Sequence, residues 1–112
     1  MAQAARLGDA ISGITSGEHS GHTEPCSASA ISGSINGGCS ADVFINGKPA
    51  ATAGSTTLEK DSCCGSAYGN IASGSGSVFI NGKAAARNGD ALNAHSGTAL
   101  IVSGSNDVLI GE

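Results

Sequence analysis

The feature that most constrains the fold of this chain is a 14-residue segment that occurs nearly twice. Residues 42–55 return as residues 77–90, at an offset of 35 residues, and nine of the 14 positions are identical. Residues 5–9 match the closing half of the same segment, and residues 107–111 match its opening half. Repetition at this period is typical of small units that bury a core only together. We therefore predict a pseudo-threefold body of three copies, in which the first and last are interrupted by the chain termini.

The composition predicts a single domain, residues 1–112, with a thin core. Gly and Ser supply 35 of the 112 residues, whereas the chain has two Phe, one Tyr and no Trp. An aperiodic chain of this composition would be disordered, but the recurring Val-Phe-Ile segment argues against disorder. Small domains with so sparse a core usually gain stability from disulfides, a metal ion or an attached partner.

Charge and hydropathy exclude several classes of function. Charged residues make up 12% of the chain and the formal net charge is −4, so the chain has no basic patch for nucleic acid. The longest apolar run, residues 99–102, is too short to cross a bilayer. The first residues include Arg6 and Asp9 but no long apolar stretch, so we expect no Sec-type signal peptide.

Each copy is interpreted as a strand, a turn and a second short strand, and the whole fold as all-β. Residues 43–45 and 78–80 are β-forming segments that end at Asn-Gly, the strongest two-residue hairpin signal. Glycine-serine segments that begin with Ile precede the strands, at residues 31–34, 71–75 and 101–105. Between these elements we predict three loops, at residues 10–30, 56–70 and 91–99.

The three predicted loops hold the residues best suited to bind a metal ion. They contain every His and three of the four Cys: His19, His22, Cys26, Cys63, Cys64 and His95. If the copies surround a threefold axis, the loops meet at one end and bring these side chains together. Thiolate and imidazole groups suit tetrahedral Zn²⁺. The adjacent pair Cys63-Cys64 lacks the spacing of a zinc knuckle, so the pattern indicates zinc without fixing the ligands.

Other interpretations of these residues stay open. Either of the adjacent residues Cys63 and Cys64 could form a disulfide with Cys26 or Cys39. His19 could be a solvated side chain. A small zinc-dependent hydrolase is one alternative function, and a disulfide-stabilised secreted binding module is another. The chain has no nucleophile elbow, phosphate loop or metalloprotease motif. Asp9 and Asp90 occupy equivalent repeat positions, which indicates turn capping rather than acid–base catalysis.

The repeated segment resembles the PAAR-repeat family, which is named for a Pro-Ala-Ala-Arg motif. The motif stands here as Gln-Ala-Ala-Arg at residues 3–6, Pro-Ala-Ala-Thr at 49–52 and Ala-Ala-Ala-Arg at 84–87. No copy is the full literal motif, but the resemblance covers essentially the whole chain and the longer pattern is specific. It implies a small cone of short β-strands from three pseudo-threefold repeats, with an apex that is cross-linked by a metal ion.

The resemblance also implies the ligands of a structural zinc ion: His19, His22, Cys64 and His95, with Cys63 and Cys26 as substitutes. Residues 94–97 match the third-loop ligand segment of the family. In the first loop an apparent insertion places the His residues later than in the family. In the second loop Asp-Ser at residues 61–62 precedes the Cys pair, where the family often has a His, so the fourth ligand is left open.

The function implied by the resemblance is mechanical rather than enzymatic. Such a tip caps the trimeric spike of a contractile injection apparatus, in a type VI secretion system, a phage tail or a related particle, and sharpens it for membrane puncture. The implied partner is a homotrimeric VgrG-like spike protein that binds one copy of the chain. Effector attachment, transient contact with the target membrane and no contact with nucleic acid are further expectations. The chain is expected to be made in the cytoplasm and delivered with the particle, without a fused toxin domain.

Overall fold

The computed structural model describes residues 2–14, 30–61, 65–93 and 98–110, and all regular structure in these ranges is β. Six strands form one sheet: β2 (Ala10–Ile14), β3 (Ala30–Gly37), β6 (Thr56–Asp61), β7 (Gly65–Ile71), β10 (Leu92–Asn93) and β11 (Thr98–Ile101). Six shorter strands form three pairs: β1 (Ala2–Gln3) with β12 (Leu109–Ile110), β4 (Phe44–Ile45) with β5 (Lys48–Pro49), and β8 (Phe79–Ile80) with β9 (Lys83–Ala84). The all-β prediction is confirmed. The described ranges offer no helix that could cross a membrane.

Two of the short pairs are the predicted Asn-Gly hairpins. Asn46-Gly47 joins β4 to β5, and Asn81-Gly82 joins β8 to β9. Both residues of each turn have positive φ, 54° and 78° in the first turn and 53° and 81° in the second. This is the type I′ geometry whose twist matches that of the flanking strands, so the predicted turns are confirmed.

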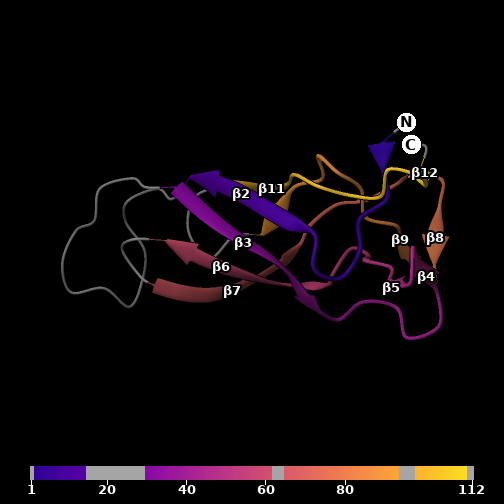
Figure 1. The fold of residues 1–112 in the computed structure, drawn as a ribbon, viewed down its shortest axis with the longest axis horizontal. Coiled ribbons are helices and arrows are strands. Elements are labelled where there is room, and N and C mark those ends of the chain that lie inside the picture. Colours follow the sequence, from indigo (N-terminus) through magenta and orange to yellow (C-terminus); the bar gives the residue numbers. More distant parts are fainter. Residues whose placement is uncertain (1, 15–29, 62–64, 94–97, 111–112) are drawn as a thin grey trace.

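The third short pair is assembled from the two ends of the chain. In β1 and β12, Ala2 lies opposite Ile110, just as Lys48 lies opposite Ile45 in the first hairpin. Figure 1 shows β12 at the same end of the molecule as β4, β5, β8 and β9. The fragments of the repeat at the two termini therefore complete one copy together.

A closed ring of backbone hydrogen bonds marks the threefold axis. Ala5 N donates to Ala86 O, Ala86 N to Ala51 O and Ala51 N to Ala5 O, each over 3.0 Å. Each of these alanines is buried and is the third residue of its four-residue motif copy. Three donors and three acceptors close such a ring only when three equivalent segments surround one axis. The predicted pseudo-threefold arrangement is confirmed, and Ala fits there because a larger side chain would hold the three backbones apart.

The six-stranded sheet curls until its edges nearly meet. Its order is β10-β7-β6-β3-β2-β11, all neighbours are antiparallel, and a bridge between Ala91 and Leu100 links the two edges. Consecutive strands pair as two long hairpins, β2–β3 and β6–β7 (Figure 1), whereas β10 and β11 are the two edges of the sheet. The prediction that residues 10–30, 56–70 and 91–99 are loops is therefore wrong for the described parts of those segments.

Close contact between strands explains why these Gly- and Ser-rich segments are not loops. A Cβ on Gly33 would lie 1.8 Å from Leu58 O, and a Cβ on Gly13 would lie 2.0 Å from Thr98 O. Neighbouring backbone fills the space that a side chain would need, so only Gly fits at either position. The composition that usually indicates a loop is here what allows a narrow, nearly closed sheet.

In the second copy, one more residue separates the isoleucine from the valine of the short strand than in the other two copies. This extra residue shifts the alignment of the second copy with the others. Equivalent backbone bonds of 2.8, 2.8 and 2.7 Å run from Gly8 to Ile35, Gly54 to Ile71 and Gly89 to Ile101. The counterpart of the other two isoleucines is therefore Ile35, and the predicted alignment through Ile31 is wrong by four residues. The pairing of β3 with β6 shifts between Ile35 and Gly37, where a β-bulge accommodates the extra residue.

The core has two layers, and the described side chains in it are aliphatic. The larger layer lies inside the sheet and contains Ala5, Ile11, Ile35, Ala51, Ile71, Ala86, Leu92, Ala99 and Ile101. The smaller layer lies among the short hairpins and contains Ala4, Ile45, Ala50, Ile80, Ala85 and Ile110. The smaller layer is built from the same positions in successive copies, and so are two sets in the larger layer: Ala5, Ala51 and Ala86, and Ile35, Ile71 and Ile101. The arrangement is consistent with the predicted small all-β cone.

Candidate functional site

The predicted metal ligands lie outside the described residues. His19, His22 and Cys26 fall in residues 15–29, Cys63 and Cys64 in residues 62–64, and His95 in residues 94–97. Within the described ranges, no group of three or more His, Cys, Asp or Glu side chains could hold a metal ion. The zinc ion and its ligand set therefore stay predictions.

The strands that flank these segments are placed, and they are neighbours in the sheet. Ile14 at the end of β2 lies opposite both Ala30 at the start of β3 and Thr98 at the start of β11. In the β6–β7 hairpin Asp61 lies opposite Gly65, and β6 in turn pairs with β3. Figure 1 shows these ends of β2, β3, β6 and β7 at the end of the molecule away from β4 and β8. This arrangement is compatible with a metal site at which side chains from the three segments converge.

The interior of the sheet carries a polar group that the sequence analysis missed. Thr57 and Glu59 are both 0% exposed, and Thr57 Oγ1 has no hydrogen-bond partner among the described residues. A Cβ on Gly69 would lie 2.0 Å from Glu59 Oε2, 2.6 Å from Asn93 O and 3.1 Å from Thr57 Oγ1. The Glu59 carboxylate therefore packs directly on the backbone of β7. Strand alternation over residues 56–61 would have directed Glu59 inward with Thr57 if the segment had been assigned to a strand.

Two motif copies close with the same ion pair. Arg6 Nη2 lies 2.9 Å from Asp9 Oδ1, and Arg87 Nη2 lies 2.8 Å from Asp90 Oδ1. Each carboxylate also accepts a hydrogen bond from the backbone N of its Arg, over 2.7 Å in both copies. Burial by itself raises the pKa of Asp9, but the hydrogen bonds and charge of Arg6 outweigh burial and hold that pKa below its usual value. The predicted turn-capping role of Asp9 and Asp90 is confirmed.

The remaining copy replaces this ion pair with hydroxyl groups. Thr52 N donates to Ser55 Oγ over 3.0 Å, which keeps the backbone contact without a charge. A pocket of about 130 Å³ lies beside Thr52 and is also lined by Cys39 and Asn81. Cys39 is a free, half-buried cysteine, and burial raises the pKa of its thiol. The alternative of a disulfide at Cys39 therefore gains no support from the structure.

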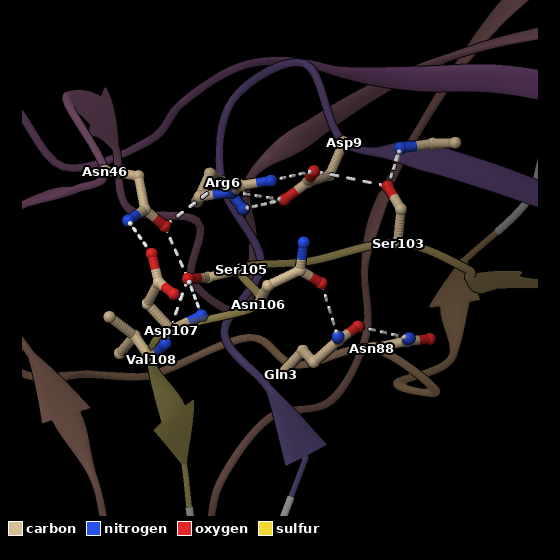
Figure 2. Close-up of polar contacts among 11 residues, drawn as sticks. Gln3, Arg6, Asp9, Asn46, Asn88, Ser103, Ser105, Asn106, Asp107 and Val108 are labelled. Atoms are coloured by element: carbon tan, nitrogen blue, oxygen red, sulfur yellow. Dashed lines mark hydrogen bonds and ion pairs between the residues drawn. The ribbon is translucent and has the colours of Figure 1, made fainter.

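The asparagines of the hairpin turns tie neighbouring copies together. Arg6 Nη1 donates to Asn46 Oδ1 over 3.1 Å, and Asn46 Nδ2 donates to Asp107 Oδ2 over 3.1 Å (Figure 2). At the equivalent position, Asn81 Nδ2 donates to Asp42 Oδ1 over 2.6 Å. These bonds fix each short hairpin against the next copy, so the turn residues also set the geometry of this end of the molecule.

The end formed by the short hairpins exposes a large apolar side chain at the same position of every copy. Phe44 in β4, Phe79 in β8 and Leu109 in β12 are 56%, 61% and 50% exposed, and we call these three residues the apolar ring. Their neighbours Ile45 and Ile80 are only 7% and 8% exposed. The sequence analysis did not single out the ring. The signal that could have found it is the placement of both Phe of an aromatic-poor chain at the same position of the repeat.

Comparison with known proteins identifies one matching family. The family model described as the PAAR motif matches residues 28–101 and residues 66–112, which together span 85 of the 112 residues. No curated protein sequence matches the chain. The matched span contains the motif copies at residues 49–52 and 84–87 and all three members of the apolar ring.

Proposed function

Because this chain belongs to the PAAR-motif family, we propose that it caps the trimeric spike of a contractile injection apparatus and sharpens it for membrane puncture. Proteins of this family are structural spike-tip components of such systems rather than enzymes. The proposed partner is a homotrimeric VgrG-like protein. We propose one copy of the chain on each trimer.

The observation that carries this proposal is the hydrogen-bonded ring of Ala5, Ala51 and Ala86. A trimer offers three equal contact sites around its axis. A single chain can contact all three in the same way only if it presents three similar surfaces around an axis of its own. The triplicated backbone of this chain has that property, and a chain with one unrepeated surface would contact the subunits unequally.

We further propose that a structural Zn²⁺ joins the three segments that connect β2 to β3, β6 to β7 and β10 to β11. Its ligands would be His19, His22, Cys64 and His95, with Cys63 and Cys26 as substitutes. Imidazole and thiolate are the ligands that structural zinc prefers, and they come from segments whose flanking strands are neighbours in the sheet. A core of Ile, Leu and Ala leaves a need for such a cross-link. Structural zinc contributes roughly 10 kcal/mol or more to the folding of small peptides.

The remaining parts of the proposal concern the setting in which the tip works. We propose that the chain is made in the cytoplasm, assembled into a type VI, phage-tail or related particle, and delivered outside the cell or into a target cell. Effector proteins attach to the assembled tip, and the target membrane is contacted only transiently. A net charge of −4 supports a role that does not involve nucleic acid.

Native mass spectrometry of the chain mixed with purified VgrG-like trimers tests the capping function. We expect one copy of the chain for each trimer. Three copies for each trimer, or no binding to any trimeric spike, would contradict the proposal. Metal analysis of the same sample, together with a count of free thiols, separates the tip from the disulfide-stabilised alternative. One zinc ion for each chain is expected, whereas paired cysteines without metal would indicate a disulfide-stabilised module.

A further inference from the structure

We propose that the apolar ring anchors the chain on its trimeric partner, with one ring side chain in each of three equivalent apolar sites. This inference rests on the proposed function and adds the chemistry of the contact. The partner surface would carry three apolar sites around its threefold axis, each flanked by acidic side chains.

Backbone hydrogen bonds establish that the three ring positions are equivalent. The valine before each ring residue accepts a hydrogen bond of 2.9 Å from the second residue of a motif copy: Val43 from Ala50, Val78 from Ala85 and Val108 from Ala4. The isoleucine after each ring residue is buried in the smaller core layer. Because side chains alternate across a strand, each ring side chain lies on the strand face opposite that core. The ring therefore has the same threefold axis as the backbone.

The position of the two phenylalanines requires a reason other than folding. Both Phe of the chain belong to the ring and are more than half exposed, whereas the described core residues are aliphatic. Aromatic side chains bury more apolar surface than any other and dominate the energetics of interfaces. A chain with so thin a core gains little stability from exposed Phe44 and Phe79. A partner that covers them would recover the free energy of burying that surface.

Symmetry and charge together identify the occupant. A partner with threefold symmetry can contact all three ring residues in the same way. The hairpins that carry Phe44 and Phe79 also carry Lys48 and Lys83, both exposed. A trimer with apolar sites flanked by acidic groups complements both the ring and the lysines.

Matched substitutions test the ring on the VgrG-like trimer that binds the unmodified chain. Phe44→Ser and Phe79→Ser each remove an anchor, whereas Tyr68→Ser removes a side chain of β7 that is 66% exposed and outside the ring. In calorimetric titrations, each ring variant should raise Kd by about tenfold or more, because truncation of a central interface anchor typically costs that much. Tyr68→Ser should leave Kd within about twofold, as expected for a residue outside the interface.

The outcomes distinguish this inference from the proposed function. Phe44→Leu and Phe79→Leu keep an apolar side chain and should bind within a few-fold of the unmodified chain, which guards against misfolding of the Ser variants. If the Ser ring variants and Tyr68→Ser bind equally well, the anchor proposal is wrong while capping stands. If the unmodified chain binds no trimer, both proposals are wrong. If light scattering then finds a dimer that Phe44→Ser dissociates, a second copy is the occupant of the ring.

Discussion

Replacement of Gly33 by Ala tests the close strand contact on which the narrow sheet depends. The new Cβ would lie 1.8 Å from Leu58 O, 2.9 Å from Leu58 C and 3.3 Å from Glu59 Cα. Ordinary contacts between such atoms are about 3.5 Å or longer, so β3 and β6 would have to separate by more than about 1 Å. All three atoms belong to backbone, and no side-chain rotation can relieve the overlap.

The magnitude follows from the cost of overpacking. Extra atoms in a packed interior typically cost about 1–3 kcal/mol, and a clash with backbone belongs at the upper end of that range. Ala itself favours the folded strand over Gly by about 0.5–1 kcal/mol, which offsets part of the cost. We therefore expect Gly33→Ala to lower the free energy of unfolding by about 2 kcal/mol, or Tm by about 8 °C for a domain of this size.

Urea unfolding monitored by circular dichroism measures this effect, and Gly37→Ala is its control. Gly37 is in the same strand, has no positive φ, and a Cβ there would meet no heavy atom within 4 Å. The control variant should be as stable as the unmodified chain or slightly more stable. Equal stability of Gly33→Ala and Gly37→Ala would refute the close approach of β3 and β6.

Three other predictions concern single interactions. Because the folded-state pKa of Asp9 is lowered, its contribution to stability is present above the unfolded-state value of about 3.9 and is lost as pH falls through the folded-state pKa. Asp9→Asn should therefore cost about 2 kcal/mol at pH 7 and much less in acid, and an equal cost at both pH values would contradict this reasoning. Asn81→Ala should lose about 1 kcal/mol in urea unfolding, because Ala disfavours a φ of 53°, and an unchanged stability would argue against the type I′ turn. Removal of zinc with a chelator should lower Tm by more than about 10 °C, and His95→Ala should reduce the zinc content measured by mass spectrometry; full zinc occupancy in that variant would exclude His95 as a ligand.

The repeat and its turns could be predicted because their determinants are local. Positive φ at Asn46 and Gly47 follows from an Asn-Gly pair between two β-forming segments. The capping role of Asp9 follows from its position after the motif, three residues from its own Arg. The closure of one copy by both termini follows from fragments of the repeat at both ends. The turn and the cap need only a few neighbouring residues, and the closure needs only the likeness between segments of the chain.

The long hairpins could not be predicted because their determinants are distant in sequence. Gly13 must be Gly since Thr98 passes close to it, and Gly33 must be Gly since Leu58 does. A composition rich in Gly and Ser indicates a loop when such contacts are unknown. The same error hid Glu59, because an inward direction can be assigned only after the segment is recognised as a strand. The β-bulge between Ile35 and Gly37 also depends on pairing with a distant strand, so nothing in the sequence indicates it and the predicted alignment of the second copy runs through Ile31.

The candidate site was only partly accessible from the sequence. The zinc ligands were proposed from residue type and resemblance, and they lie outside the described residues. The apolar ring required exposed fractions, because a Val-Phe-Ile segment does not indicate which of its side chains faces solvent. Phe44 is exposed and Ile45 buried since the strand packs its isoleucine against the small alanines of the motif.

A cryo-electron microscopy structure of the chain bound to a VgrG-like trimer tests the central claim most directly. We expect a single chain at the tip of the spike, with the hydrogen-bonded ring of Ala5, Ala51 and Ala86 centred on the threefold axis of the trimer. A chain bound to the side of the spike, or three chains related by that axis, would contradict the account.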